Sequence, residues 1–360
     1  MTRNIQQPPS LPCRPRDVRD VRDVRPSVLS RAQLRACGVS PARAAARCGA
    51  DGPWQRTLPG VYVLHRRPLT ADERLRAALL YAGRPPAPGR RGAPGGDPGA
   101  GYGGAVVTGF AALALRGFAV VPPPGEWSGI DVLVPHARRS RPVGYVRPVR
   151  SAAVPPPGWV RGLPVAPVER ALADAVAGLR APSAVRRLLV GAVRGGHCEP
   201  GAAVDELGRI GLLDRPPVAR AADALLAEDR AMAESRLYDL VMEHDLPQPL
   251  WNVCLRLPGG PRLGAVDAYW PGRAVAVALV AGGPGRGGPG DGGRHRTERE
   301  ARWAAHAAER EHLERLGITV VRLAPEGLRD AGGRQAAAVR TALRAAADRE
   351  PAARVVVLPR

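Results

Sequence analysis

Short helical and extended patterns alternate near the start of the chain, after a polar leader. Ser30 and the glutamine three residues after it have the form of a capping box, which predicts a helix over residues 31–37. A second serine, followed by proline, predicts another helix over residues 41–48. Two brief extended segments hinged at Pro59-Gly60 then predict a hairpin. Two helices followed by a hairpin indicate a winged helix-turn-helix over residues 27–68.

The next part of the chain, residues 69–230, combines helical and extended patterns. Its predicted elements, in chain order, are a helix over 70–81, a helix-like segment over 109–118, a strand over 130–134, a helix over 167–178 and more helices up to about 230. Residues 82–104 are rich in glycine, proline and arginine, which is the composition of a linker. We expect a small α/β middle unit with a helical tail, and no pattern in it points to a particular chemistry.

A different order of elements toward the end of the chain predicts a separate domain over residues 231–348. These elements are a helix over 232–244, strands over 262–270 and 274–281, a helix over 296–316, a strand over 318–323 and a helix over 332–348. A Gly/Pro-rich insert covers residues 282–293, and the tail, 349–360, either adds an edge strand or is loose. The order favours a three-layer α/β domain, so we expect a multidomain protein of α+β and α/β class.

The charge of the chain points to a polyanionic partner. The formal net charge is +20, and every basic residue is arginine because the sequence contains no lysine. A surplus of this size favours nucleic acid, although the enrichment in alanine, glycine, proline and arginine is also typical of a GC-rich genome. Residues 1–26 repeat Asp-Val-Arg three times and predict a disordered basic arm.

Cysteine usage and the lack of long apolar runs predict a cytoplasmic protein with no membrane partner. The five cysteines are widely spaced and form no CxxC pair, so neither a disulfide framework nor a zinc finger is expected. The first residues lack an apolar signal core, and no run approaches the roughly 18 apolar residues that a membrane span needs.

Candidate DNA contacts follow from the predicted helix-turn-helix, in which the second helix reads the major groove. Arg43 and Arg47 lie four residues apart on that helix, so both are expected on one face, where they would meet base edges or phosphates. The candidates for phosphate contacts share a position beside the hairpin: Gln55, Arg56, Arg66 and Arg67. The alternative is a solvated arginine face on a fold that binds proteins.

The N-terminal segment contains four motifs at a specific spacing: LSRAQL at 29–34, GVS at 38–40, WQR at 54–56 and PGVY at 59–62. With these motifs it resembles AbiEi-type antitoxins from actinobacteria. The resemblance implies a winged helix that binds operator DNA and represses an antitoxin-toxin operon, while the rest of the protein counteracts a nucleotidyltransferase-like toxin. Many relatives in that family carry a C-terminal domain of the very-short-patch-repair type, within the PD-(D/E)XK nuclease group.

The C-terminal segment is similar to that nuclease-like domain. The matching motifs, in order, are AESRL at 233–237, LP at 246–247, VDAYWP at 266–271 and GITVVRL at 317–323.

The catalytic pattern of this nuclease group is only partly present. The resemblance implies catalytic positions for Glu234 and Asp267, but Ala278 and Ala281 stand where the family has acids, and the chain has no lysine. One strand carboxylate binds magnesium poorly, and Asp291 lies in the Gly-rich insert, so it is not expected to replace a ligand. We therefore expect vestigial acids, no catalysis and no metal or other cofactor, with Mg²⁺ required only if the nuclease is active.

Other motifs predict no further chemistry. Gly283, Gly285 and Gly288 spell GxGxxG, but prolines interrupt the motif and no helix start follows, so dinucleotide binding is not expected. His306 and His312 are six residues apart and do not share a helical face.

Three functions remain open at this point. The first is a DNA-binding transcriptional regulator that resembles type IV antitoxins, with double-stranded DNA as its partner and a nucleotidyltransferase-like toxin as the partner that the resemblance implies. The second is a metal-dependent DNA endonuclease of the very-short-patch-repair type. The third is a protein-interaction module that does not bind DNA.

Overall fold

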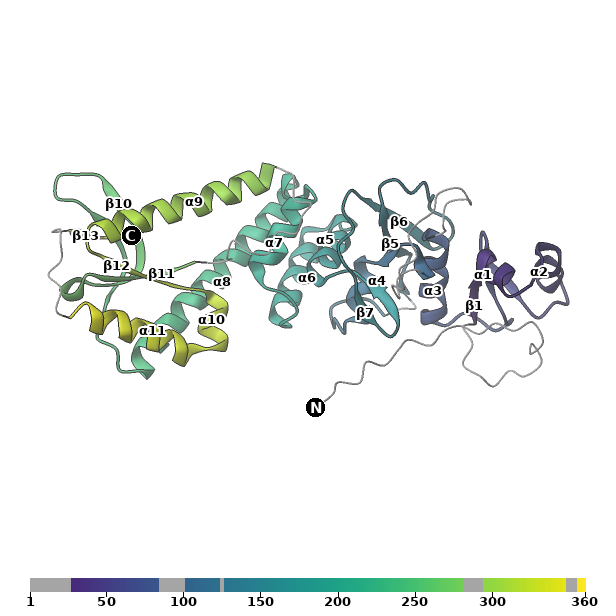
Figure 1. Cartoon of the computed structure of the whole chain (residues 1–360), viewed down its shortest axis with the longest axis horizontal. Helices are drawn as coiled ribbons and strands as arrows, with labels where there is room; N and C mark the ends of the chain where they lie inside the picture. Colours follow the sequence, from purple (N-terminus) through teal and green to yellow (C-terminus); the bar gives the residue numbers. More distant parts are fainter. Residues whose placement is uncertain (1–26, 84–100, 124–125, 281–293, 348–354) are drawn as a thin grey trace. The chain divides into compact units, whose positions relative to one another are not determined.

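The computed structural model describes residues 27–83, 101–123, 126–280, 294–347 and 355–360 (Figure 1). The chain divides into two compact units, Met1–Ala171 and Leu172–Arg360. Both units contain helices and a β-sheet, which confirms the expected multidomain mixed α/β class. The predicted arm at 1–26, most of the predicted linker at 82–104 and the insert at 282–293 lie outside the described residues.

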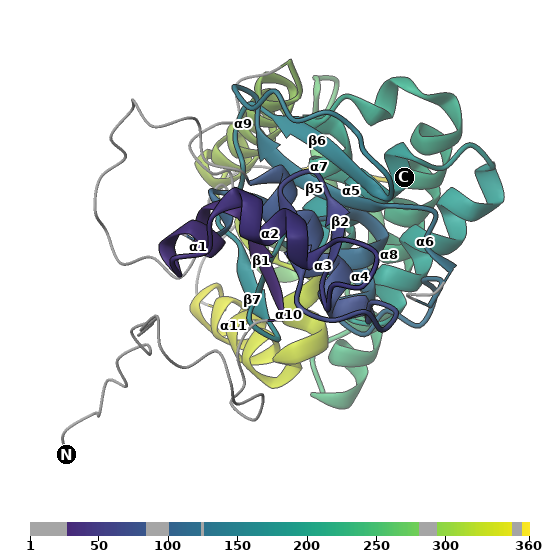
Figure 2. The ribbon, with the colours of Figure 1, turned by 90° about the vertical axis from the view of Figure 1, so that its right-hand side faces the viewer.

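The first unit begins with two short helices and a small antiparallel sheet of order β1-β3-β2. The elements are β1 (Val28–Ser30), α1 (Arg31–Ala36), α2 (Pro41–Arg47), β2 (Gln55–Leu58) and β3 (Val61–Val63). The predicted capping box is present, because Ser30 Oγ accepts the Gln33 N–H at 3.2 Å and Gln33 Oε1 accepts the Ser30 N–H at 2.8 Å. The α1 and α2 helices lie side by side (Figure 2). Both predicted helices and both hairpin strands are confirmed.

A second sheet, of order β6-β5-β4-β8-β7, completes this unit. Its strands are β4 (Val106–Val107), β5 (Ile130–Pro135), β6 (Val146–Ser151), β7 (Gly158–Val160) and β8 (Leu163–Val165). Its helices are α3 (Ala71–Ala82), α4 (Gly109–Leu115) and α5 (Val168–Ala177), of which the last crosses into the second unit. The sequence pattern predicted the helices but only β5 among the strands, because the others are short or interrupted by proline.

Glu73 joins the two parts of the first unit. Its side chain is 7% exposed and lies in the first turn of α3. One carboxylate oxygen accepts hydrogen bonds from Ser27 Oγ at 2.7 Å and His65 Nε2 at 2.8 Å, and Arg67 donates to both oxygens. The other oxygen accepts the Thr70 N–H at 2.9 Å. Burial alone would raise the pKa of Glu73, but hydrogen bonds from Ser27, Thr70 and His65 outweigh it and lower the pKa from 4.5 to about 2.

The second unit begins with helices α6 (Pro182–Arg194), α7 (Pro200–Arg209) and α8 (Pro216–Glu243). The last of these spans 28 residues and runs without a break through residue 230, where the sequence analysis placed a domain boundary. The predicted helix over 232–244 is the second half of α8. None of the described helices has the length and apolar character of a membrane span.

A five-stranded mixed sheet of order β12-β11-β10-β9-β13 follows α8. Its strands are β9 (Leu250–Arg256), β10 (Arg262–Trp270), β11 (Val275–Leu279), β12 (Thr319–Leu323) and β13 (Val356–Pro359). Only β11 and β12 are parallel, and the other pairs are antiparallel. The sequence pattern predicted β10, β11 and β12 but not β9. For the tail it left two alternatives, an edge strand or a loose segment, and the tail forms the edge strand β13.

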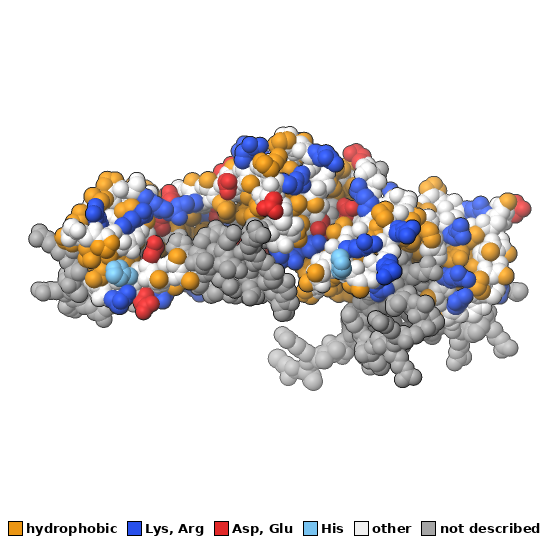
Figure 3. Space-filling model, turned by 90° about the horizontal axis from the view of Figure 1, so that it is seen from above, with side chains coloured by type: hydrophobic (Ala, Val, Ile, Leu, Met, Phe, Trp, Pro, Cys, Tyr) orange, Lys and Arg blue, Asp and Glu red, His pale blue; other side chains and the backbone are white. Residues whose placement is uncertain are grey.

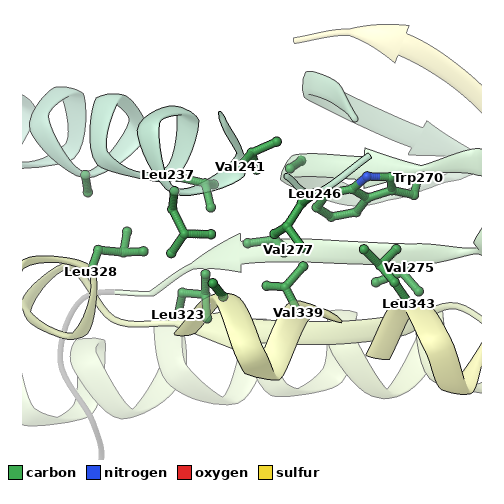
Figure 4. Packing of buried hydrophobic residues seen from close by; sticks show 14 of the residues in the cluster. Leu237, Val241, Leu246, Trp270, Val275, Val277, Leu323, Leu328, Val339 and Leu343 are labelled. Carbon is green, nitrogen blue, oxygen red and sulfur yellow. The ribbon is translucent and has the colours of Figure 1, made fainter. Parts of the chain in front are cut away.

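Helices cover both faces of this sheet. On one face, side chains from α8, α10 (Pro325–Asp330) and α11 (Gly332–Ala345) form a core in which Leu237 and Val241 meet Val277 and Val339 (Figure 4). On the other face, Leu313 of α9 (Arg294–Arg315) packs in a second buried cluster over the sheet. The predicted three-layer order is therefore present in the described residues.

The Glu73 network generates a prediction about pH. Ionised Glu73 stabilises the fold fully above pH 4.5, and this stabilisation is lost as the pH falls toward 2, because its pKa is lowered on folding. In Glu73→Gln the free energy of unfolding should fall by about 3 kcal/mol at neutral pH, at about 1.4 kcal/mol for each pKa unit. The difference from the wild type should shrink steadily below pH 4.5 in urea unfolding curves.

Asp72→Asn is the matched control, since Asp72 lies in the same helical turn. It should leave the stability nearly unchanged. An equal loss in both variants would show that charge at the helix end, and not the hydrogen-bond network, is responsible.

Candidate functional site

The two arginines predicted on one face of α2 have different surroundings. Arg43 is exposed, and its side chain makes no hydrogen bond or ion pair to another described residue. The guanidinium of Arg47 lies 4.8 Å from the ring centre of Trp54, which is 6% exposed. Arg47 is therefore part of the packing between α2 and the hairpin, while Arg43 is available to a ligand.

The residues predicted beside the hairpin also separate into two groups. Arg56 is exposed and has no ion-pair partner within the described ranges. Gln55 donates from Nε2 to the backbone oxygen of Arg67 at 2.8 Å, and Arg67 itself pairs with Glu73. Gln55 and Arg67 therefore hold the chain between β3 and α3 in place.

Arg66 binds the loop that follows α2. It donates to the backbone oxygens of Gly52 at 2.6 Å and Ala50 at 2.9 Å, and also to that of Gly49. Burial raises the pKa of the Cys48 thiol, and the charges of Arg56 and Arg66 oppose this shift. Both arginines are thus close to the end of α2, but only Arg56 has its guanidinium free of backbone contacts.

The surface around α1, α2 and the hairpin is strongly basic. Residues 27–68 contain seven arginines and a single acidic residue, Asp51. Figure 3 shows more arginine than acidic side chains at the right-hand end, where these elements lie. All of these arginines except Arg47 are exposed, but Arg66 and Arg67 are bound to other groups of the chain. Four exposed arginines have side chains without a hydrogen-bond or ion-pair partner among the described residues: Arg31, Arg35, Arg43 and Arg56. The sequence analysis missed the first two, although their spacing of four on a predicted helix was the same signal that selected Arg43 and Arg47.

In the second unit, the two acids predicted as vestigial lie close together. Asp267 of β10 is 5% exposed, and Glu234 projects from α8. Arg230 joins them, because its Nη2 is 2.5 Å from Asp267 Oδ1 and its Nε is 2.9 Å from Glu234 Oε1. Arg360 Nη1 lies 3.5 Å from the same Asp267 oxygen, and the Leu279 N–H donates to the other oxygen at 2.6 Å.

A backbone irregularity lies beside these acids. Asn252 of β9 has a φ of 50°, in the left-handed region. Its neighbours Trp251 and Val253 pack on opposite faces of the sheet, although positions two apart on a regular strand share a face. The strand register places Asp267 opposite Asn252. Both residues border a pocket of about 160 Å³, whose other lining residues are Glu234, Leu237, Tyr238 and Trp251.

These residues do not fit a magnesium ion. Magnesium needs oxygen ligands with free lone pairs in near-octahedral geometry. One Asp267 oxygen accepts from guanidinium groups, and the other accepts a backbone N–H whose positive end would repel a cation. Ala278 on β11 brings no ligand, and Ala281 lies outside the described residues. No group of three His, Cys, Asp or Glu side chains suited to a metal occurs in the described part of the chain.

Sequence reasoning missed Arg230 and Arg360. The signal for Arg230 was its spacing of four from Glu234 on a helix. It was overlooked because the helix was expected to begin at residue 232, whereas α8 begins at Pro216. Nothing in the sequence pairs Arg360 with Asp267, because strand order alone brings the two together.

Two other sequence motifs add nothing to this site. Asp291 and the GxGxxG glycines lie outside the described residues. His312 contacts Arg315 on the same helix, at 3.3 Å.

Comparison of the chain with protein-family models and with curated proteins gave no match.

The Arg230–Asp267 pair generates a stability prediction. Asp267→Asn removes the charge that faces Arg230, so a guanidinium near the core loses its main counter-ion. The free energy of unfolding of the second unit should fall by about 2 kcal/mol, less than the cost of breaking a fully buried ion pair, because Asp267 is buried but the Arg230 side chain is 40% exposed. Denaturant titration followed by tryptophan fluorescence measures it, since Trp251 and Trp270 lie in this unit.

Asp239→Asn removes a carboxylate from the exposed side of α8 and serves as the control. It should cost well under about 1 kcal/mol. If Asp267→Asn is equally mild, then Asp267 does not hold the helix to the sheet.

Proposed function

We propose that this chain is a DNA-binding transcriptional regulator of the kind implied by its resemblance to AbiEi-type antitoxins. In this proposal α1, α2 and the β2–β3 hairpin form a winged helix-turn-helix. The observation that carries the proposal is the exposed arginine surface of these elements, which has one acidic residue in residues 27–68. Such a surface suits the phosphate backbone of duplex DNA, which dominates the affinity of DNA-binding proteins.

Within this surface we assign base contact to Arg43. It lies in the first turn of α2, and the N-terminal residues of a recognition helix are those that meet base edges. An exposed guanidinium there can donate two parallel hydrogen bonds to guanine. Arg35 on α1 and Arg56 on the hairpin are assigned to phosphate contacts. Such contacts would fix the position of the protein along the DNA without distinguishing one base sequence from another.

The remaining arginines of the motif position this surface. Arg47 packs on Trp54, Arg66 binds three backbone carbonyls of the loop after α2, and Arg67 is paired with Glu73. A binding surface gains affinity when its elements are held rigid before the ligand arrives. These contacts support a preformed surface in which α2 and the hairpin keep a constant spacing.

The second unit is assigned a scaffold role without hydrolysis. The support for this assignment is that Glu234 and Asp267 are bound by Arg230, and that Ala278 supplies no third acid. Double-stranded DNA is then the direct partner, and no cofactor is required. The resemblance also implies a nucleotidyltransferase-like toxin, whose effect this protein would counteract in the cytoplasm.

The proposal is tested by titrating the full chain against the DNA upstream of its own reading frame and against unrelated duplex of equal length. The wild type should bind both, with affinity that falls steeply as salt rises, and should prefer the upstream DNA. Arg43→Ala should weaken specific binding about tenfold and reduce that preference, since a bidentate base contact contributes about 1–3 kcal/mol. Arg56→Ala should weaken both complexes alike and lower the salt slope by about 1.

Arg187→Ala, an exposed arginine on α6, is the matched control and should bind like the wild type. Equal effects of Arg43→Ala and Arg187→Ala would contradict the assignment of α2. If the chain binds neither duplex even at low salt, the whole proposal is contradicted and a protein-interaction module is favoured.

A further inference from the structure

Two carboxylates and two guanidinium groups meet where the pairing of β10 with β11 ends. The last paired residues are Ala268 and Val277, next to Asp267. Beyond this point the Asp267 carboxylate accepts the Leu279 N–H in place of a strand partner. The charges of Glu234 and Asp267 are matched by those of Arg230 and Arg360.

A positive charge is needed at this position for a physical reason. Asp267 is 5% exposed, and removing an ionised carboxylate from water is costly unless a counter-ion and hydrogen bonds replace the water. A divalent ion would supply two positive charges to two carboxylates. Arg230 and Arg360 supply the same total charge from within the chain.

We propose that Arg230 is a built-in cation, seated between Glu234 and Asp267 in the place of a divalent ion, and that removing its side chain opens a latent divalent-cation site. The guanidinium suits this position because its planar fork reaches both carboxylates at once, with Nε on Glu234 and Nη2 on Asp267. This inference rests on the geometry of the second unit alone, so its test does not depend on whether the chain binds DNA.

The tether explains why the intact chain should not bind a divalent ion here. Arg230 and Glu234 lie four residues apart on one helix, so the guanidinium stays beside the carboxylates at a high effective concentration. An ion from solution would have to break both of its ion pairs, one of them to the buried Asp267, before it could reach the carboxylates. The arginine therefore excludes the ion more effectively than a dissolved competitor would.

Without the guanidinium, the site has the ligands for weak ion binding. Glu234 Oε1 and Asp267 Oδ1 are the two oxygens that Arg230 bridges, and they would face the space it leaves. Arg360 stays 3.5 Å from the Asp267 oxygen, so its charge keeps the binding of an ion weak. The adjoining pocket of about 160 Å³ has room for the waters that complete an octahedral shell. Ions held by one or two carboxylates usually keep several waters, so Mn²⁺ is a suitable probe.

Electron paramagnetic resonance of Mn²⁺ tests the proposal, because the signal of the free ion falls when the ion is bound. We expect no Asp267-dependent binding by the wild type at millimolar Mn²⁺, and one added site in Arg230→Gln. The double variant Arg230→Gln/Asp267→Asn should lose that site. Mn²⁺ should also raise the melting temperature of Arg230→Gln by about 3 °C and that of the wild type by less than about 1 °C.

Arg220→Gln is the control, since Arg220 is exposed on the same helix and has no ion pair in the part of the chain that the structure describes. It should behave like the wild type. Folded Arg230→Gln that binds no Mn²⁺ would overturn the proposal, and so would an Asp267-dependent site in the wild type. If Arg230→Gln does not fold alone, refolding with Mn²⁺ should restore its circular dichroism, and failure to do so counts equally against the proposal.

Discussion

A carboxylate removed from water needs donors, and in this chain two buried carboxylates connect elements that lie far apart in sequence. Glu73 receives hydrogen bonds from residues before β1, after β3 and at the start of α3. Asp267 receives them from α8 and from the end of β11, and it forms an ion pair with Arg360, which follows the C-terminal strand. Each carboxylate therefore links three segments within its own unit, because a buried carboxylate without partners would be costly.

Arginine contributes to both groups of partners, and it takes the place that lysine could have because the sequence contains no lysine. The guanidinium carries five N–H groups in a planar fork, so one side chain can bind two carboxylates or several carbonyls. Arg230, Arg66 and Arg67 use the fork in this way to bind groups of the chain itself. The positive charge of the chain is therefore only partly available to a ligand, and arguments from net charge to nucleic-acid binding depend on the exposed arginines that have no partner in the described residues.

Local patterns predicted elements where the chain carries local signals. The capping box at Ser30 and the Ser40-Pro41 start gave helices that agree with α1 and α2 to within one residue. Strands of two to three residues, such as β4 and β8, were missed because periodicity cannot appear in so short a segment. β9 was missed although it is seven residues long, and the change of packing face at Asn252 breaks its alternation.

The sequence by itself determined the helix caps, the hairpin turn and the arginine surplus, since each depends on residue type at one position or at a fixed short spacing. Only the tertiary structure decided which arginines remain available to bind a ligand such as DNA. Arg43 and Arg47 are equivalent as a sequence pattern, but Trp54 packs against only one of them. The pairing of Arg360 with Asp267 likewise depends on strand order, which a local pattern does not contain because strand pairing joins residues that are distant in the chain.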